Sequence, residues 1–144
     1  MSAAAKLYTP ELLALTVRLA DYPWSAELPW QGDARSPSCG STLAMGIDCD
    51  ALGRIDRLGL RAQACAVGQA AAAIFADAAI GRDRTAIAAT ESALRAWLAG
   101  EGTTPDWPGI TILEPARAYP GRHGAILLPW MAALRALPKP PEGR

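Results

Sequence analysis

The stretch SPSCGSTLAMGIDCDALGRIDRLGLRAQACAVGQAAAAIFADAA, residues 36–79, carries the pattern that decides the fold. Apolar residues alternate with small or polar ones over residues 42–50, which predicts a half-buried strand. The Asp-Ala-Leu-Gly sequence that follows is typical of a hairpin turn, so residues 54–64 should return as the partner strand. Ile55 falls out of the alternation of that strand, which indicates a β-bulge. The segment therefore predicts an antiparallel hairpin that leads into an alanine-rich helix.

The flanking sequence is mainly helical. A proline-containing arm over residues 22–35 predicts irregular structure or a short edge strand, and the Gly/Pro-rich stretch 101–120 predicts an extended loop. Apolar periodicity and capping residues predict four helices. They cover Pro10 to about Asp21, Ala66–Ala79, a segment capped by Asp83 or Thr85 that runs to Leu98, and about Ala125 to Leu137. Pro129 in the last of these is tolerated only in a first turn.

These elements define the fold class and the domain organisation that we expect. Strands that precede a run of helices are typical of an α+β fold, here a small antiparallel β-sheet with helices packed on one face. Residues 1–138 should form a single domain, and residues 139–144 a disordered tail.

The composition of the chain excludes several functional classes. The 144 residues carry no net charge, so nothing indicates nucleic-acid binding. The sequence lacks an apolar run of about 20 residues and an apolar signal segment, which argues against membrane insertion and secretion. Three cysteines without regular spacing favour a reducing compartment, and we expect the cytoplasm. The sequence also shows none of the nucleotide-binding or hydrolase motifs, so we expect a protein that is not an enzyme.

Two of the cysteines lie in settings that suit metal or sulfur chemistry. Cys39 lies in a turn of small residues, and Cys65 begins the alanine-rich helix. A thiol at a helix N-terminus faces unpaired N–H groups, which favour the thiolate that binds metals. The alternative is that both thiols only fill space, as buried free cysteines often do. Cys49 follows Leu43, Met45 and Ile47 along one strand face, so we expect it to act as a small buried hydrophobe.

The order of these features resembles the U-type iron–sulfur cluster assembly scaffold family. The resemblance rests on Pro-x-Cys-Gly at residues 37–40, a strand hairpin, a second cysteine at a helix start after 25 intervening residues, and Tyr-Pro-x-Arg at 119–122 before a Trp-bearing last helix. It covers the chain from Leu7 to about Leu137. The long segment between Cys65 and Tyr119 is similar to the insertion of the SUF-type branch.

The resemblance implies a site of three cysteines and one aspartate, which assembles a [2Fe–2S] cluster or holds Zn²⁺. Cys39 and Cys65 match the first and second cysteines of that site, Ser41 stands at the aspartate position, and Ala125 stands at the third cysteine position. His123, the single histidine, is the candidate substitute ligand, and a solvent-exposed histidine is the alternative. A serine hydroxyl binds metals weakly at neutral pH, so Ser41 is a minor candidate ligand.

These residues should converge where the 38–41 turn, the start of the Ala66 helix and the 121–124 loop meet. Three functions follow from the resemblance. The first is a scaffold or carrier that binds iron or a [2Fe–2S] cluster through Cys39 and Cys65. The second is a zinc-dependent sulfur acceptor that works with a cysteine desulfurase, and the third is a degenerate scaffold that acts only as a binding or regulatory module. The implied partners are a cysteine desulfurase and recipient apoproteins, and we expect a monomer or a weak homodimer.

Overall fold

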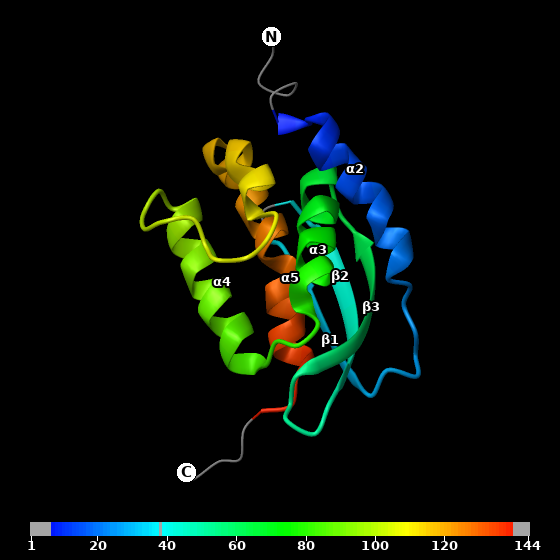
Figure 1. Ribbon diagram of the computed structural model, residues 1–144. Helices are drawn as coiled ribbons and strands as arrows, with labels where there is room; N and C mark the ends of the chain where they lie inside the picture. Colours follow the sequence, from blue (N-terminus) through cyan, green and yellow to red (C-terminus); the bar gives the residue numbers. More distant parts are fainter. Residues whose placement is uncertain (1–6, 38, 140–144) are drawn as a thin grey trace.

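The computed structural model describes residues 7–37 and 39–139 (Figure 1). The last five residues of the predicted disordered tail lie outside these ranges, as does Ser38 of the predicted site turn. The elements follow in the order α2 (Pro10–Arg18), η1 (Leu19–Asp21), β1 (Trp30–Arg35), β2 (Thr42–Cys49), β3 (Ile55–Gln63), α3 (Ala66–Ala79), α4 (Arg84–Leu98), η2 (Ile110–Ala118), η3 (Pro120–Arg122) and α5 (His123–Ala136).

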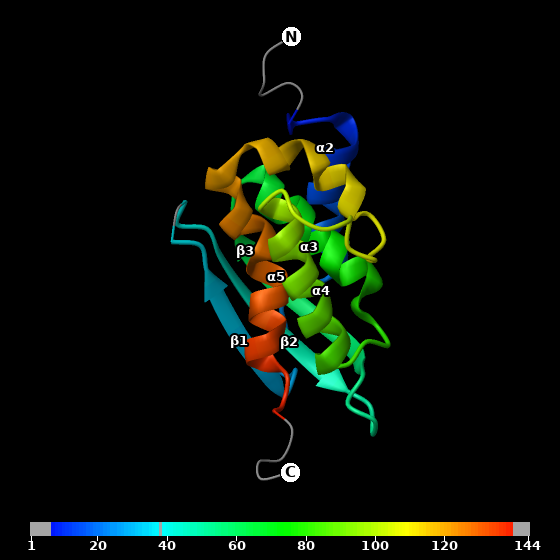
Figure 2. The ribbon, with the colours of Figure 1, turned by 90° about the vertical axis from the view of Figure 1, so that its left-hand side faces the viewer.

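The strands form an antiparallel three-stranded sheet in the order β1-β2-β3, and helices cover one of its faces (Figures 1 and 2). The predicted α+β fold is therefore confirmed. No helix in the described ranges is both long enough and apolar enough to cross a bilayer.

The β2–β3 hairpin follows the register that the sequence predicts. Thr42 pairs with Gln63, and the register shifts between Asp48 and Cys49, opposite Ile55. The bulge is thus present, with its extra residue, Asp56, on β3. The Asp50 carboxylate accepts the backbone N–H of Leu52 and that of Arg54 at 2.9 and 3.0 Å, which closes the turn.

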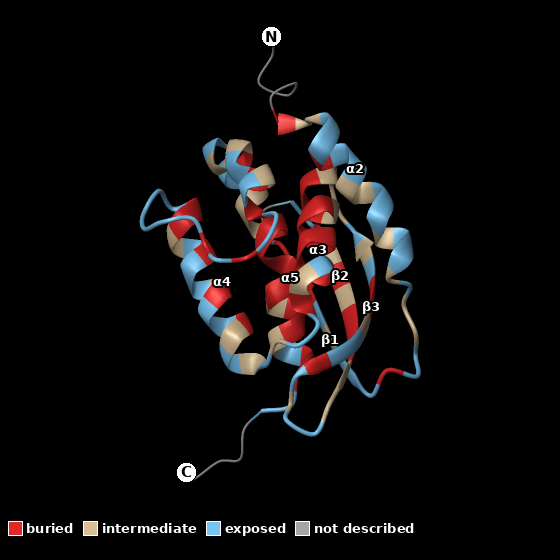
Figure 3. Cartoon of the chain, in the orientation of Figure 1, coloured by how far each residue is buried: buried red, intermediate tan, exposed pale blue. Residues whose placement is uncertain are grey.

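The core lies between the inner face of the sheet and helices α3 and α5 (Figure 3). Leu43, Met45 and Ile47 point into it and are at most 1% exposed, as their alternation predicts. Alanines on α3 have short side chains, so the helix backbone packs close to its neighbours. At the centre, the Phe75 ring stacks on Trp107 and meets Trp130 edge-on, with ring centroids 5.3 Å apart in both pairs.

The arm before β1 packs against the sheet. The backbone N–H of Leu60 donates to the Tyr22 carbonyl at 3.0 Å, so the arm runs along the free edge of β3. A Cβ on Gly59 would lie 2.1 Å from the Pro23 carbonyl oxygen, and one on Gly46 would lie 2.9 Å from Leu28 Cβ. Only glycine permits this approach, which fixes the arm across the outer face of β2 and β3.

Two expectations for the C-terminal half are wrong. The 101–120 stretch is not an extended loop throughout, because η2 and η3 occupy its second half and the residues that follow. In η2 the apolar residues Ile110, Leu113 and Ala116 recur every three positions, so a helix with three residues per turn buries all of them. Pro129 lies in the second turn of α5 rather than in a first turn, because the helix already begins at His123. Its buried ring packs in the core, which offsets the lost backbone hydrogen bond.

Candidate functional site

The sheet register brings two of the cysteines to one end of the molecule. Thr42 at the start of β2 pairs with Gln63 at the end of β3. Cys39 precedes Thr42 by three residues and Cys65 follows Gln63 by two, so both leave the sheet at this end. Cys49 pairs with Ile55 beside the hairpin turn, at the opposite end of the sheet.

A tight turn presents the Cys39 thiol. The Ser36 N–H donates to the Ser41 carbonyl at 2.8 Å, and the Gly40 N–H donates to the Ser36 carbonyl at 2.9 Å. Gly40 has a φ of +74°, the left-handed conformation that glycine adopts without strain. Cys39 is exposed, and its sulfur lies 3.4 Å from Ser36 Oγ and 3.1 Å from Ser41 Oγ. Two buried serines therefore hold one exposed sulfur between their hydroxyl groups.

This environment favours the thiolate form of Cys39. Hydrogen bonds from the Ser36 hydroxyl, and then from that of Ser41, lower the pKa of the Cys39 thiol. The positive charge of Arg122 at the start of α5 lowers this pKa further, while partial burial of the thiol opposes the shift. A thiolate binds soft metals and attacks electrophilic sulfur, so Cys39 is suited to either reaction.

Cys65 occupies the N-cap position of α3, with an extended backbone at φ −64° and ψ 170°. The N–H of Gln69 donates to the Cys65 carbonyl at 2.9 Å, and the Gln69 side-chain amide donates to the Ala64 carbonyl at 2.8 Å. These bonds fix the entry into the helix. The Cys65 side chain is half-buried and packs against the core. Its place at the helix start is confirmed, and its environment is more apolar than that of Cys39.

The first turn of α5 packs against the start of α3. Ala125 is fully buried, and a Cβ on Gly68 in α3 would lie 3.2 Å from its Cβ. The same Cβ would lie 2.9 Å from Ala64 Cβ, next to Cys65. The position that the family resemblance assigns to a third cysteine thus faces the start of α3 and is filled by a packed methyl group.

His123 is half-buried, and its ring is already engaged. Nε2 lies 3.0 Å from the Arg117 carbonyl oxygen in η2. Because a carbonyl only accepts, this contact places the imidazole proton on Nε2 and leaves Nδ1 as the one nitrogen for a metal. The imidazole is therefore half-buried, with one ring nitrogen engaged by the protein.

The candidate ligands do not form a complete metal site in this chain. Among residues 7–37 and 39–139, no three His, Cys, Asp or Glu side chains gather closely enough to hold a metal ion. An iron–sulfur cluster is usually held by four thiolates. Cys39 and Cys65 could supply at most two of these thiolates, so a cluster held by four thiolates would need two more from outside the protein.

Two features of the site were not predicted from the sequence. Ser36 and Arg122 both act on the Cys39 sulfur, one by a hydrogen bond and one by charge. The serines on either side of the Pro-x-Cys-Gly turn could have indicated the hydrogen bond to Cys39, because serine hydroxyls in turns often bond to nearby groups. Arg122 belongs to the Tyr-Pro-x-Arg motif, yet its effect on Cys39 depends on tertiary structure.

Comparison with known proteins supports the fold. No protein-family model matches the sequence, and no curated protein matches it significantly. Among solved structures, the N-terminal part of a nitrogen-fixing NifU-like protein from Brucella abortus is similar with a TM-score of 0.84 at 25% identity, over 94% of both chains. A putative iron–sulfur cluster assembly scaffold protein for the SUF system from Fervidobacterium islandicum AW-1 gives 0.80 at 18% identity, over 92% of this chain and 97% of that one. A hypothetical protein gives 0.65 at 18% identity, over 87% and 95%.

The chain therefore has the fold of the U-type iron–sulfur cluster assembly scaffolds, and the resemblance that the motifs carry is confirmed. Both the NifU-like and the SUF-type branches are represented among these similar structures.

Proposed function

We propose that this protein is a scaffold or carrier in iron–sulfur cluster assembly, which holds iron or a labile [2Fe–2S] unit through Cys39 and Cys65. The observation that carries the proposal is the placement of both thiols at one end of a scaffold-type fold. Cys39 is exposed and favoured as the thiolate, so it makes the first contact with iron. Cys65, at the adjacent helix start, is the second ligand.

Two protein thiolates leave a cluster incompletely ligated, and this determines its behaviour. The remaining positions would be filled by small thiols or by cysteines of a partner protein, which exchange readily. A cluster held in this way is passed on easily to a recipient apoprotein. On this proposal the role is not enzymatic, the compartment is the cytoplasm, and a cysteine desulfurase supplies the sulfur. His123 and Ser41 are secondary ligands, since Nδ1 alone remains for the first and a neutral hydroxyl for the second.

The second candidate is a zinc-dependent sulfur acceptor that works with a cysteine desulfurase. In this role the Cys39 thiolate attacks the outer sulfur of the desulfurase persulfide, forms a Cys39 persulfide and releases the desulfurase cysteine as a thiolate. The exposed thiol of Cys39 and its lowered pKa favour this role. The third candidate is a degenerate scaffold that binds partners only, which the packed methyl of Ala125 favours.

Anaerobic reconstitution with Fe²⁺ and sulfide separates these candidates. Cys49→Ser is the matched control, because Cys49 lies at the opposite end of the sheet, beside the hairpin turn. The wild type and Cys49→Ser should develop visible charge-transfer bands with stoichiometric iron and acid-labile sulfide, while Cys39→Ser and Cys65→Ser should not. A different result would support the sulfur acceptor. In that case the wild type takes up no iron but is labelled with sulfur by a desulfurase, and Cys39→Ser is not labelled. A wild type that gains neither iron nor sulfur would support the degenerate module.

A further inference from the structure

The outer face of the sheet carries a groove that the site described above does not use. A hollow of about 470 Å³ lies between Asp33 on β1 and Arg61 on β3, and Thr42 and Gln63 also line it. A second hollow of about 290 Å³ adjoins it and shares Asp33, Ala44 and Arg61. Asp33, Ala44 and Arg61 are paired in register across the three strands. The small side chain of Ala44 thus forms the floor, and longer side chains on β1 and β3 form the walls.

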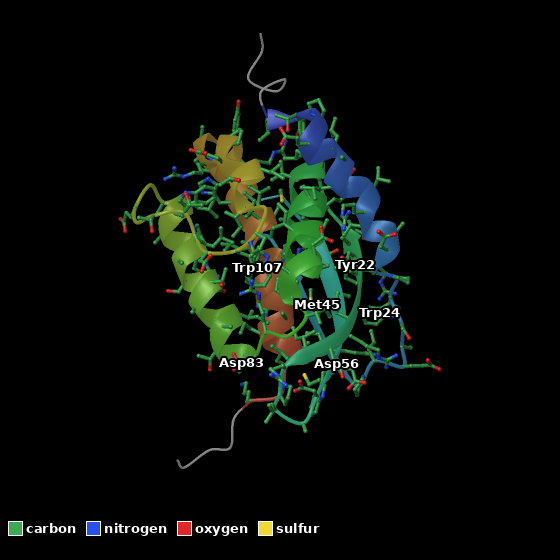
Figure 4. All side chains as sticks on the ribbon, viewed as in Figure 1. Tyr22, Trp24, Met45, Asp56, Asp83 and Trp107 are labelled. Carbon is green, nitrogen blue, oxygen red and sulfur yellow. The ribbon has the colours of Figure 1, made fainter. Side chains whose placement is uncertain are left out.

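The two walls carry opposite charges that the protein itself leaves unmatched. Neither Asp33 nor Arg61 belongs to an ion pair among the described residues. The ion pairs found there are those of Arg18, Arg54, Arg57 and Arg95. The Arg61 guanidinium lies 4.8 Å from the centroid of the Trp24 ring, and this contact holds the guanidinium in place. Trp24 lies on the arm (Figure 4). The Arg135 guanidinium donates to the Asp33 carbonyl at 2.8 Å and fixes the backbone of the other wall.

The groove leads toward the cysteines. It starts at Trp24 and Gln31 and ends at Thr42 and Gln63, the pair of residues at the end of the sheet from which Cys39 and Cys65 extend. The arm covers Gly46 and Gly59 and so bounds the groove on the side of the hairpin turn. A molecule that lies in this groove would have one end beside the cysteines.

We propose that this groove binds an extended segment of a partner protein, which carries one basic and one acidic side chain. The walls stand two strand spacings apart, about 10 Å, which is the width that one extended chain spans with side chains pointing to both sides. Successive side chains of an extended chain point in opposite directions, so a basic residue reaches Asp33 while its acidic neighbour reaches Arg61. Gln63 and Thr42 offer hydrogen-bond partners to the backbone of the segment. Gln31 offers its amide oxygen, because its amide nitrogen donates to the Ala26 and Leu28 carbonyls.

This inference rests on the proposed function in one respect, namely that the cysteine end of the sheet is the place where the bound partner is needed. Binding is measured on metal-free protein, so failed reconstitution and failed peptide binding are separate results. The probe is an array of acetylated hexapeptides of Ser and Thr that carry one Lys and one Glu in every arrangement. Versions with Gln in place of Lys, of Glu or of both serve as peptide controls.

The protein variants are Asp33→Asn and Arg61→Gln, with Arg57→Gln as the matched control. Arg57 lies on the same face of β3 but outside the groove, paired with Asp48 at 3.4 Å. The best Lys/Glu peptide should lose about tenfold in affinity when either groove charge is removed, and Arg57→Gln should leave it unchanged. In Asp33→Asn, replacing the peptide Lys by Gln should no longer change the affinity, whereas replacing the peptide Glu by Gln should still lower it. In Arg61→Gln, replacing the peptide Glu should no longer change the affinity, whereas replacing the peptide Lys should still lower it.

The proposal is overturned if no Lys/Glu arrangement binds better than the all-Gln peptide, or if the protein and peptide substitutions act independently. It is also overturned if Asp33→Asn and Arg61→Gln change the oligomeric state in light scattering, because a second copy of the chain would then occupy the groove. The groove would instead be assigned to a small zwitterion if free amino acids displaced the peptide and their binding required both Asp33 and Arg61.

Discussion

The Ser41 hydroxyl lies 3.1 Å from the Cys39 sulfur, at the position where the resemblance to the U-type family places an aspartate. A carboxylate there would repel a thiolate, whereas a hydroxyl donates a hydrogen bond to it. Ser36 on the other side of the turn adds a second hydroxyl. Serine at this position therefore favours the free thiolate of Cys39, which the aspartate implied by the resemblance would not do.

The first prediction concerns the pH dependence of thiol alkylation. Because the folded pKa of Cys39 is lowered, its alkylation by iodoacetamide should approach its plateau below the pH at which an ordinary thiol does. The double substitution Ser36→Ala/Ser41→Ala should shift the midpoint of this profile to higher pH. Burial, with Asp48, Asp56 and Asp50 nearby, raises the pKa of Cys49, so its profile should lie at higher pH than that of Cys39. Mass spectrometry of each cysteine peptide measures the rates, and identical profiles for Cys39 in both proteins would contradict the role of the serines.

The same shift has a consequence for stability. A thiol whose pKa is lowered by folding is stabilised as the thiolate, so this contribution is present above the unfolded pKa and is lost as pH falls through the folded pKa. Cys39 is exposed, so solvent weakens the effect, and alkylation is a more sensitive readout than denaturation.

A second prediction restores the third cysteine of the family site. Ala125→Cys should add a thiolate beside the start of α3 and make a reconstituted cluster longer-lived. Because Ala125 is fully buried, the added sulfur should cost about 1–3 kcal/mol of the free energy of unfolding. Ala133→Cys is the matched control, a fully buried α5 alanine two turns further from the site. Decay of the visible absorption after reconstitution measures the lifetime, and equal lifetimes in the two variants would count against a ligand position at 125.

A third prediction concerns the arm. Gly59→Ala should destabilise the fold by about 1–3 kcal/mol, because the new Cβ would lie 2.1 Å from the Pro23 carbonyl oxygen. Gly121→Ala is the control, since a Cβ there meets no described atom within 4 Å. Urea unfolding followed by tryptophan fluorescence measures both. Equal stability of the two variants would show that the arm does not pack on β3 as described.

Much of the fold follows from local sequence pattern. The alternation of Leu43, Met45 and Ile47 and the alanine run of α3 are long enough to predict both elements and their buried faces. The 3-10 segment η2 was missed because its apolar residues repeat over only a few turns, in a stretch whose glycines and prolines indicate a loop. Pro129 was misplaced because the burial of its ring in the core, and not its local propensity, decides its position.

The site is predictable to a smaller extent. The motifs place Cys39 and Cys65 at a turn and at a helix start, and in the sheet register both segments leave the sheet at the same end. The hydrogen bond between His123 and the Arg117 carbonyl depends on how η2 meets α5, so the sequence could not predict that one ring nitrogen is occupied. The effect of Arg122 on Cys39 joins residues distant in sequence and was invisible for the same reason.

The most direct test of the central claim is a Co²⁺ titration of the reduced, metal-free protein, because thiolate-to-cobalt charge-transfer absorption scales with the number of bound thiolates. The wild type and Cys49→Ser should show the intensity of two thiolates at one ion per chain, and Cys39→Ser and Cys65→Ser should each show one. Identical spectra for the wild type and Cys65→Ser, or no charge-transfer band in the wild type, would show that Cys39 and Cys65 do not share an ion.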